Sequence, residues 1–338
     1  MPERLLGKYK GENTLVTGGN GFVGRHLVKE LARLEQKVTV LDLHVDEGWK
    51  DAPEGVKFKK VDIRDPQEVK KAFTEVQPKL VFHLAANASG TRSVEDQRFN
   101  YETNDNGTFN VLEAASDVKA KRVLFVSSAS VYGTPRRFPM DEEHPKEPFV
   151  PYGYSKRRGE LMAGEFHDNQ GLDVVIARPF CIYGPGEDPK TTMVEPARYM
   201  RWNLREEPIP IVGDPDKKTR DFVNVHDIVQ GLIYVADKGE SGEAYNIGSG
   251  QEISMRQLAN TIGEVTGKPA KLKIIDEITE DTYRLVGDIS KAESLGYKPK
   301  VELKDGLTEL FESLGSNPEA PGDATIFNKS QIGKGENQ

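Results

Sequence analysis

The chain has 338 residues, of which 36% are hydrophobic and 30% charged, a composition typical of a folded globular protein. Its formal net charge of −8 argues against a non-specific nucleic-acid binder, and no apolar run approaches the roughly 18 residues that a membrane helix needs. The first residues lack the apolar segment of a secretory signal, and the single cysteine, Cys181, cannot form an internal disulfide. We therefore expect a cytoplasmic protein that binds neither a membrane nor a nucleic acid.

Runs rich in valine, leucine and isoleucine alternate with amphipathic stretches through the first half of the chain. Each run has about the length of a β-strand, and such alternation is typical of a parallel sheet covered by helices on both faces. Residues 22–34 carry apolar side chains at near three- and four-residue spacing, which predicts a helix packed on the sheet. The expected strands cover residues 13–17, 37–42, 56–62, 79–85, 122–128 and 173–179.

The pattern changes after about residue 180, where proline, glycine and charged residues separate shorter elements. We expect residues 1–180 to form a Rossmann-type domain of the α/β class, with a doubly wound parallel sheet. A smaller C-terminal lobe would cover mainly residues 181–312, while residues 226–245 would return to the larger domain. Residues 313–338 are polar and rich in glycine and proline, as in a flexible tail.

Four glycines follow the first strand within seven positions, at Gly18, Gly19, Gly21 and Gly24. In a dinucleotide-binding loop such glycines allow a tight turn, leave bare backbone beside a pyrophosphate and let the next helix pack closely on the strand. A helix that begins near Phe22 would direct its free N–H groups and its positive end at the anion. An isolated glycine turn can equally bind nothing, so the neighbouring residues decide between these interpretations.

Two aspartates at strand ends are candidate contacts of a dinucleotide. Asp42 ends the second predicted strand, where a carboxylate accepts hydrogen bonds from both ribose hydroxyls and repels a 2′-phosphate. It therefore favours NAD over NADP, and a solvated aspartate at a strand end is the alternative. Asp62 ends the third predicted strand and is expected either to contact adenine or to cap the turn that follows.

Tyr152 and Lys156 are four residues apart, so both side chains lie on one face of a helix. The ammonium of Lys156 favours the phenolate form of Tyr152, and we expect it to lower the pKa of that phenol toward neutrality. An exposed pair on a surface helix is the alternative. Upstream, Ser127 and Ser128 end the fifth strand, where their hydroxyls either hydrogen-bond a substrate oxygen or cap the backbone.

The glycine loop, the serine pair and Tyr-x-x-x-Lys, in this order, resemble the extended short-chain dehydrogenase/reductase family, and within it the branch of nucleotide-sugar epimerases and dehydratases. The resemblance covers about residues 11–312. It implies an NAD-dependent enzyme that acts on a nucleotide sugar, bound mainly by the smaller lobe. Further motifs of the family stand at His83–Ala86, Asn104, Arg178–Gly186, Arg220–Asp227 and Tyr245–Gly250.

The resemblance implies a role for each matching residue. Tyr152 would be the catalytic acid and base, Lys156 its electrostatic partner, and Ser128 the hydrogen-bond partner of the reacting sugar oxygen. Arg220 would contact the substrate diphosphate, and Cys181 would stand in the substrate site where many relatives have asparagine. The implied contacts of NAD are Gly18, Gly21, Phe22, Val23, Asp42, Asp62, Ile63, Leu84, Ala85, Ala86, Asn104, Ser127, Tyr152, Lys156 and Pro179.

A second interpretation of Arg220 stays open. Its planar guanidinium suits phosphate oxygens, but Asp221 and Asp227 are close enough in sequence to form a surface ion pair with it. We also expect Asp227 to cap the helix that follows it.

The strand end after Ser128 distinguishes among the reactions of the branch. Dehydratases usually carry an acidic pair where this chain has Ala129 and Ser130, and decarboxylases carry a glutamate in the same segment. An epimerase needs neither, so the preferred prediction is a 4-epimerase of a UDP-hexose, such as UDP-glucose or UDP-galactose, or of a derivative. The alternatives are a dehydratase or decarboxylase, a 4-ketoreductase, and a non-catalytic NAD-binding regulatory protein.

The resemblance also implies a homodimer, in which helices at 104–116 and 152–169 of two copies pair as a four-helix bundle. From the sequence alone, the apolar faces of these helices could equally cover the sheet. We expect no metal site, because the six histidines are scattered and have no cysteine partners.

Overall fold

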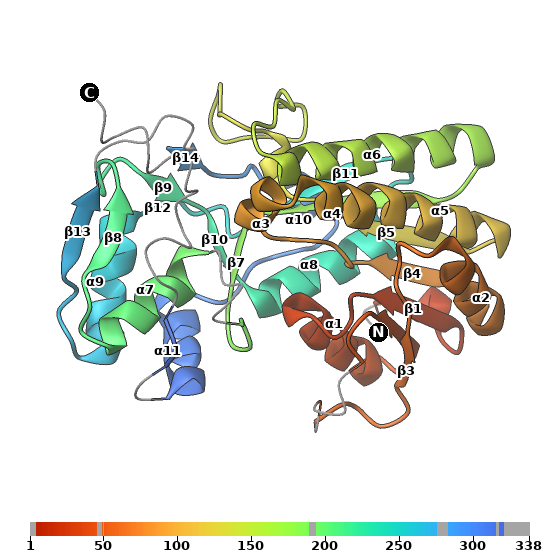
Figure 1. Cartoon of the computed structure of the whole chain (residues 1–338), viewed down its shortest axis with the longest axis horizontal. Coiled ribbons are helices and arrows are strands. Elements are labelled where there is room, and N and C mark those ends of the chain that lie inside the picture. The colour runs from red at the N-terminus through yellow and green to blue at the C-terminus, as the bar shows by residue number, and fades with distance from the viewer. Residues whose placement is uncertain are drawn as a thin grey trace.

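A computed structural model describes residues 5–45, 49, 51–188, 194–275, 283–315 and 318–320, except for the side chains of residues 90–92. The chain forms a large domain around one central sheet and a smaller lobe at one end (Figure 1). Most of the tail predicted at 313–338 lies outside the described residues.

Seven parallel strands form the central sheet, in the order β11-β6-β5-β4-β1-β2-β3. The register pairs Val16 of β1 with Val40 of β2 and with Phe82 of β4. The chain winds outward from β1 in both directions, so the strand order reverses between β1 and β4, the usual ligand site of such sheets. The predicted Rossmann-type, doubly wound sheet is thereby confirmed. Its strands are β1 (Asn13–Thr17), β2 (Lys37–Asp42), β3 (Lys57–Lys60), β4 (Leu80–His83), β5 (Arg122–Val126), β6 (Val174–Pro179) and β11 (Ala244–Ile247).

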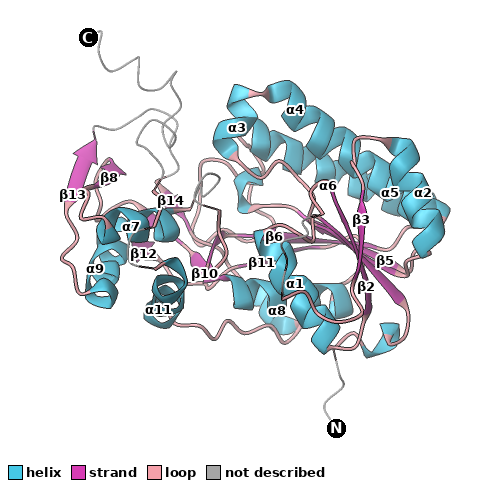
Figure 2. Cartoon of the chain, turned by 60° about the horizontal axis from the view of Figure 1, so that its bottom comes forward, coloured by secondary structure: helices cyan, strands magenta, loops and turns pink. Residues whose placement is uncertain are grey.

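Helices cover both faces of this sheet (Figure 2). Neighbouring residues of one strand belong to different cores, since Val16 packs on the side of α1 and α8 and Leu15 on the side of α2, α5 and α6. Because side chains alternate along a strand, a strand buried on both faces is a continuous apolar run in the sequence. These helices are α1 (Phe22–Arg33), α8 (Val225–Lys238), α2 (Pro66–Val76), α5 (Gly107–Asp117) and α6 (Pro151–Gln170).

The segment after α8 joins the edge of the large sheet. β11 pairs in parallel with β6, from Ala244 opposite Ile176 to Ile247 opposite Pro179. Shorter elements lie along the carboxyl edge of the sheet and before β1. They are the helices α3 (Gly90–Glu95) and α4 (Gln97–Tyr101), the π-helix η2 (Glu102–Asn106), and the 3-10 turns η1 (Gly7–Tyr9) and η3 (Ala129–Val131).

The C-terminal lobe has short sheets and helices around a core of its own. β7 pairs with β10, β9 with β12 and β14, and β8 with β13. Trp202 of α7, Leu258 of α9 and Leu307 of α11 contribute to the core. The elements are β7 (Cys181–Tyr183), α7 (Glu195–Leu204), β8 (Ile209–Val212), β9 (Thr219–Arg220), β10 (Phe222–Asn224), β12 (Ile253–Ser254), α9 (Met255–Thr266), β13 (Leu272–Ile275), β14 (Arg284–Leu285) and α11 (Leu303–Leu314). The short helix α10 (Ser290–Ser294) packs instead on β11 and α8 of the large domain.

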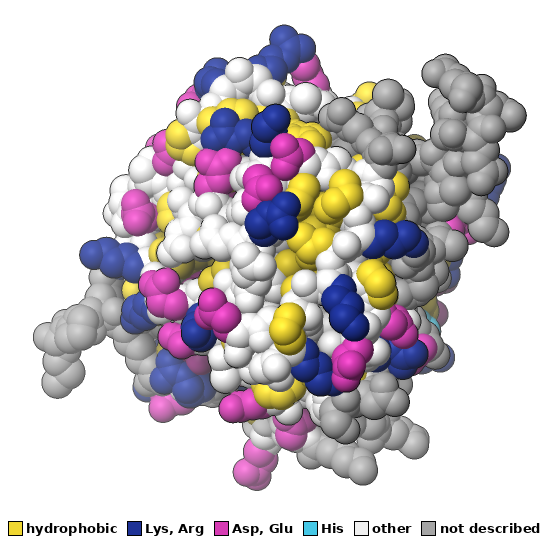
Figure 3. Space-filling view, turned by 90° about the vertical axis from the view of Figure 1, so that its left-hand side faces the viewer, with side chains coloured by type: hydrophobic (Ala, Val, Ile, Leu, Met, Phe, Trp, Pro, Cys, Tyr) yellow, Lys and Arg dark blue, Asp and Glu magenta, His cyan; other side chains and the backbone are white. Residues whose placement is uncertain are grey.

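The surface at the outer end of this lobe carries charges of both signs (Figure 3). Acidic and basic side chains are interspersed there around a small group of exposed apolar side chains. Within the described ranges, every helix is too short or too polar to span a lipid bilayer.

The start of α8 differs from the prediction. The side chain of Asn224 accepts a hydrogen bond from the backbone N–H of His226 at 2.8 Å and caps the helix. Asp227, the predicted cap, accepts hydrogen bonds from the N–H groups of Lys300 and Val301, at 3.0 and 2.9 Å. A segment remote in sequence thus uses the carboxylate that local spacing assigned to the helix end.

Candidate active site

The glycine loop connects β1 to α1 at the carboxyl edge of the sheet. Gly18 has a positive φ of 69°, and a Cβ there would lie 2.7 Å from the backbone nitrogen of Ala85. A Cβ at Gly24 would lie 2.2 Å from the carbonyl oxygen of Gly18, so only glycine allows this approach of helix to strand. Gly21 precedes the first residue of α1 and provides no side-chain cap. The first N–H groups of the helix therefore remain available as hydrogen-bond donors to an anion. The loop therefore fits the pyrophosphate of a dinucleotide.

Asp42 lies beside this loop, at the end of β2. Its carboxylate accepts hydrogen bonds from the backbone N–H groups of Asn20 and His44, both at 3.0 Å. The bond to Asn20 ties the glycine loop to β2. A carboxylate has further lone pairs, so Asp42 can still accept hydrogen bonds from the ribose hydroxyls of a dinucleotide.

Asp62 is held by a neighbour in the chain. Its carboxylate accepts hydrogen bonds from the backbone N–H of Arg64 at 3.0 Å and from Nη2 of the same residue at 2.5 Å. The guanidinium of Arg64 also lowers the pKa of Asp62. This is the turn interpretation of Asp62, and an adenine contact would compete with Arg64. The next residue, Ile63, is buried against Gly107, where a Cβ would lie 2.6 Å from its Cδ1.

His83 joins β1, β4 and α5. Its Nδ1 lies 2.7 Å from Oγ1 of Thr17, and its Nε2 lies 3.1 Å from Oγ1 of Thr108. Burial lowers the pKa of His83 to about 3, so the ring is neutral. The N–H of Ala85 donates to Oγ1 of Thr17 at 3.2 Å, which holds residues 84–86 against the glycine loop.

Tyr152 stands in the first turn of α6, next to the end of β5. The side chain of Ser128 lowers the pKa of the Tyr152 hydroxyl, and the backbone N–H of Tyr152 donates to Oγ of Ser93 at 3.1 Å. Ser128 also caps η3, because its Oγ accepts a hydrogen bond from the N–H of Ser130 at 3.1 Å. The capping interpretation of Ser128 is confirmed, and the same hydroxyl contacts the phenol.

The pKa of Tyr152 contradicts the prediction. Burial raises it to about 12, and the hydrogen bond with Ser128 opposes this rise only in part. Nζ of Lys156 lies 5.9 Å from the centroid of the Tyr152 ring and donates to the carbonyl oxygen of Val126 at 2.8 Å. The expected shift toward neutrality is therefore wrong for the free chain, because desolvation of the phenol dominates and Lys156 is not among the groups that shift this pKa.

Lys156 is buried as well, and burial lowers its pKa to about 8. The negative charge of Glu160, one turn further along α6, opposes this shift. Glu160 follows Tyr152 and Lys156 at the same four-residue spacing, so all three lie on one helix face. That spacing was the signal for Glu160, a residue that the sequence analysis missed.

Glu160 is the centre of a buried polar network. Its carboxylate accepts hydrogen bonds from Oγ of Ser127 at 2.7 Å and from Nε and Nη2 of Arg178 at 2.7 and 3.0 Å. Arg178 extends the network through Nη1, which donates to Oη of Tyr132 at 3.0 Å. Because the hydroxyl of Ser127 donates to Glu160, a contact of this hydroxyl with a dinucleotide would have to use its oxygen as an acceptor.

Asn104, in η2, uses its side chain within the protein. Its Oδ1 accepts a hydrogen bond from the N–H of Asn87 at 2.7 Å, and its Nδ2 lies 2.9 Å from Oγ of Ser155. It therefore links the loop after β4 to α6. Any role of Asn104 at the cofactor edge is indirect in this arrangement, through the position of that loop.

The substrate residues predicted in the C-terminal lobe lie directly beyond the sheet. Nε of Arg220 lies 3.8 Å from Oε1 of Glu195, which neither predicted interpretation included. Asp221 instead accepts hydrogen bonds from the N–H groups of Ser249 and Gly250, at 2.7 and 3.1 Å. The backbone N–H of Cys181 donates to the carbonyl oxygen of Asp221 at 3.0 Å, and burial raises the pKa of the thiol, which disfavours a reactive thiolate.

The carboxyl edge of the large sheet thus brings the predicted residues together. Phe22 and Val23 open α1 after the glycine loop, Pro179 ends β6, and Tyr152 opens α6. Within the described ranges, His, Cys, Asp and Glu side chains form no group of three or more that could hold a metal ion.

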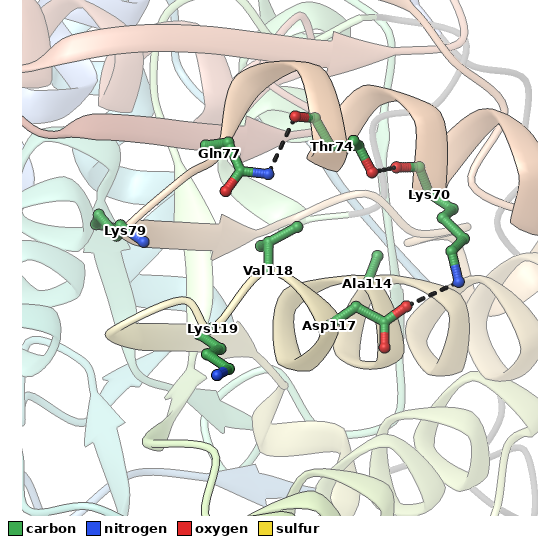
Figure 4. Close-up of a pocket in the computed structure, with 8 residues that line it drawn as sticks. All are labelled: Lys70, Thr74, Gln77, Lys79, Ala114, Asp117, Val118 and Lys119. Carbon is green, nitrogen blue, oxygen red and sulfur yellow. Dashed lines mark hydrogen bonds and ion pairs between the residues drawn. The ribbon is translucent and has the colours of Figure 1, made fainter.

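A separate cavity of about 620 Å³ lies between α2 and α5 (Figure 4). Lys79 precedes β4 and Lys119 precedes β5, so this cavity opens at the amino edge of the sheet, opposite the glycine loop. The ion pair between Lys70 and Asp117, at 3.0 Å, crosses its rim between two exposed side chains. This cavity is not part of the candidate active site.

Comparisons with known proteins agree with this geometry. The NAD dependent epimerase/dehydratase family matches residues 14–248. The UDP-glucose 4-epimerase of Mycolicibacterium smegmatis is 33% identical over 310 residues, which cover 88% of this chain and 97% of that protein. The crystal structure of UDP-glucose 4-epimerase from Thermus thermophilus in complex with NAD is 31% identical, with a TM-score of 0.82, and the match covers 89% and 98% of the two chains.

A dTDP-glucose 4,6-dehydratase from Streptomyces venezuelae, solved with NAD bound, is similar as well. It is 31% identical, with a TM-score of 0.80, and the match covers 89% of this chain and 96% of that one. Sequence, fold and the cofactor edge thus point to one family. The chain belongs to the NAD-dependent epimerase/dehydratase family, and its cofactor is NAD.

Proposed function

We propose that this protein is an NAD-dependent 4-epimerase of a nucleotide sugar, a UDP-hexose such as UDP-glucose or UDP-galactose or a derivative. The observation that carries the proposal is the juxtaposition of three groups: the buried phenol of Tyr152 at the start of α6, the side chain of Ser128, which lowers the pKa of that phenol, and Lys156 one turn further along the same face. A proton acceptor, a hydroxyl partner and a buried ammonium stand together beside the glycine loop. Such a set suits removal of a proton from a sugar hydroxyl during hydride transfer.

In the proposed reaction, Tyr152 removes the proton of the C4 hydroxyl and returns it after the 4-keto sugar has turned its other face. When bound, NAD supplies the acceptor for the C4 hydride and gives the hydride back, so it is not consumed. Ser128 hydrogen-bonds the C4 oxygen as its charge changes. Because burial keeps Tyr152 protonated in the free chain, Lys156 has to supply the positive charge that favours the phenolate.

The carboxyl edge of the sheet is the proposed NAD site. Pyrophosphate would lie on the backbone of Gly18–Gly24 and the adenosine ribose on Asp42, with residues 84–86 and Pro179 along the cofactor. The start of α1, which has no side-chain cap, and the open lone pairs of Asp42 support this placement. Residues 181–312 would mainly bind the nucleotide sugar, and the segment 226–245 would belong with the NAD-binding domain.

An epimerase fits the strand end better than a dehydratase or a decarboxylase. Ala129 is buried, and Oγ of Ser130 lies 3.1 Å from Oγ of Ser128, so this turn holds a methyl and a hydroxyl where acid and base groups would be needed. The similarity to the Streptomyces dehydratase keeps dehydration as the second candidate. A 4-ketoreductase is distinguished by consumption of the reduced cofactor.

We also propose that the enzyme is a cytoplasmic homodimer that pairs α5 and α6 of two copies in a four-helix bundle. Exposed apolar side chains support this interface: Phe109 is 42% exposed and Leu161 is 57% exposed. Both line a surface cavity of about 380 Å³. Leu161→Glu should produce a monomer in sedimentation velocity, whereas Leu43→Glu, at another exposed leucine, should leave the dimer intact. A monomeric wild-type protein would contradict the proposal.

Three measurements on the purified protein test the proposed reaction. It should carry bound NAD, interconvert two UDP-sugars as read by proton NMR, and show no net change in absorbance of the reduced nicotinamide. Tyr152→Phe should fold and bind NAD but lose at least about a hundredfold in turnover, because the acid and base group is gone. Tyr154→Phe, on the exposed face of the same helix, is the matched control and should be active.

Two results would contradict these expectations. Normal turnover of Tyr152→Phe would remove the assigned base. Product formation with matching loss of reduced cofactor would identify a reductase instead of an epimerase.

A further inference from the structure

Charged side chains gather inside the C-terminal lobe, where α7 meets β9. Arg198 and Arg220 are each 7% exposed, and the side chain of Glu195 is 13% exposed. Burial opposes ionisation of Glu195, but the charges of Arg220 and Arg198 outweigh burial and lower the pKa of the carboxyl. The glutamate is therefore ionised at neutral pH.

Arg198 has few partners for a buried guanidinium. Its Nη2 lies 3.8 Å from Oε1 of Glu195, which is beyond hydrogen-bond distance. Its Nε is buried and has no hydrogen-bond partner among the described groups. Unpaired buried donors destabilise a protein, and such donors are expected where a ligand supplies the acceptor.

Arg201, one turn later on α7, also has a buried Nε without a hydrogen-bond partner, but its two Nη atoms differ from those of Arg198. It is 4% exposed, and its Nη1 and Nη2 donate to the carbonyl oxygens of Glu319 and Glu187, at 3.1 and 3.0 Å. Arg201 thus joins α7 to two other segments of the chain. Arg198 forms no such bond within the described chain, although it lies on the same helix and is buried to a similar degree.

The position of Arg198 relates it to the proposed substrate site. Arg220 directly precedes Asp221, whose carbonyl oxygen accepts a hydrogen bond from the backbone N–H of Cys181 at 3.0 Å. Glu195 links Arg220 to Arg198, at 3.8 Å from each. Cys181 begins β7, directly after β6 ends at the carboxyl edge of the large sheet. Figure 1 shows β7 and β10 between α7 and that sheet. The charged group of Glu195, Arg198 and Arg220 is therefore close in the fold to β7 and β10, the strands that lie between α7 and the large sheet.

We infer that Arg198 binds the diphosphate of the nucleotide-sugar substrate together with Arg220, and that Glu195 is the counter-ion which the diphosphate replaces. Oε1 of Glu195 lies 3.8 Å from Nη2 of Arg198 and 3.8 Å from Nε of Arg220, one oxygen between two guanidinium groups. Phosphate oxygens suit the planar guanidinium fork and can bridge both side chains at hydrogen-bond distance. This inference rests on the proposed function, since it assigns the anionic part of that substrate.

The test is calorimetric titration of the NAD-loaded protein with UDP and with uridine, and likewise with dTDP and thymidine. Arg198→Met should lower the affinity for UDP by about tenfold to a hundredfold, because charged hydrogen bonds are lost. It should lower the affinity for uridine by less than about twofold. Arg201→Met is the matched control: it should lower the melting temperature and keep the ratio of UDP to uridine affinity. Arg198→Lys keeps the charge without the fork and should give a smaller loss of UDP affinity.

The variant Glu195→Gln distinguishes between two interpretations of this charged group: a ligand site and a purely structural ion pair. Removal of the competing carboxylate should strengthen UDP binding by up to about tenfold and leave uridine unchanged. If Arg198→Met or Arg198→Lys folds and keeps the wild-type ratio of UDP to uridine affinity, or if Glu195→Gln only lowers the melting temperature, the inference is overturned. Turnover of UDP-sugars by the wild type, measured separately, decides whether the proposed function survives that result.

Discussion

Two glutamates mark the difference between the large domain and the C-terminal lobe. Glu160 accepts hydrogen bonds from Arg178 at 2.7 and 3.0 Å. Glu195 also lies beside arginines and is largely covered, with 13% of its side chain exposed, but it stays 3.8 Å from both Arg198 and Arg220. The first carboxylate is fully hydrogen-bonded within the protein, whereas the second attracts its arginines without bonding them.

We interpret the pair of Glu160 and Arg178 as a rigid support of the fold, and the group around Glu195 as the proposed substrate site. A completed buried network is rigid, so Glu160 and Arg178 can hold the end of β5 and the middle of α6 in one geometry. Tyr152 and Lys156 stand on that helix, and the catalytic edge is therefore arranged before any ligand binds. In the lobe, Nε of Arg198 has no acceptor among the described groups, as expected if the proposed diphosphate supplies one.

The largest expected effect is a loss of folding stability when one of these two glutamates is replaced. Glu160→Gln should lower the free energy of unfolding by about 3–5 kcal/mol, because it breaks a buried ion pair and leaves Arg178 without its counter-charge. Glu195→Gln should lower it clearly less, since that carboxylate forms no hydrogen bond with either arginine. Urea unfolding measures both, with Glu165→Gln on the exposed face of α6 as control. Equal losses for the two glutamates would remove the distinction.

A smaller effect is expected at the cofactor edge. Asp42→Ala should lower the affinity for NAD by about tenfold to a hundredfold, because the ribose hydroxyls lose a charged acceptor. The ratio of NAD affinity to NADP affinity should also become smaller. Fluorescence titration with both dinucleotides checks this, and Asp51→Ala, at an exposed aspartate, serves as control. Unchanged NAD affinity in Asp42→Ala would show that the ribose lies elsewhere.

The smallest effect concerns pH. Burial lowers the pKa of Lys156 to about 8 and Glu160 opposes that shift, so Glu160→Gln should lower this pKa further. Less Lys156 is then charged at a given alkaline pH, the phenolate of Tyr152 is less favoured, and the alkaline fall of kcat should begin at a lower pH. A full pH profile of the folded variant measures this displacement. A shift of the alkaline limb to higher pH would contradict the role of Glu160 in keeping Lys156 charged.

Features set by local spacing were predictable. The apolar runs became strands within one to a few residues of their predicted ends, and the helix expected at 22–34 is α1, Phe22–Arg33. The glycines at Gly18 and Gly24 are required by backbone approach, as their loop pattern indicated. Tyr152 and Lys156 share a face because a four-residue offset is about one helical turn, whatever the helix packs against.

Features set by remote segments were not predictable from the same rules. Asp227 is taken by the N–H groups of Lys300 and Val301, so Asn224 caps α8 in its place. Glu195 and Arg198 are charged residues on an amphipathic helix, a pattern that usually marks a solvent-exposed face. Their burial depends on how α7 packs between β9 and the rest of the lobe, which the local pattern does not encode.

The sequence by itself determined the order of elements, the dinucleotide loop and the pairing of Tyr152 with Lys156, because these follow from periods and offsets along the chain, while Ser128 was placed beside them by the family resemblance. The tertiary structure decided the protonation state of Tyr152, the pairing of Glu160 with Arg178 and the burial of Arg198. The physical reason is that desolvation depends on every atom packed around a group. Those atoms come from segments whose contacts only the complete fold brings together.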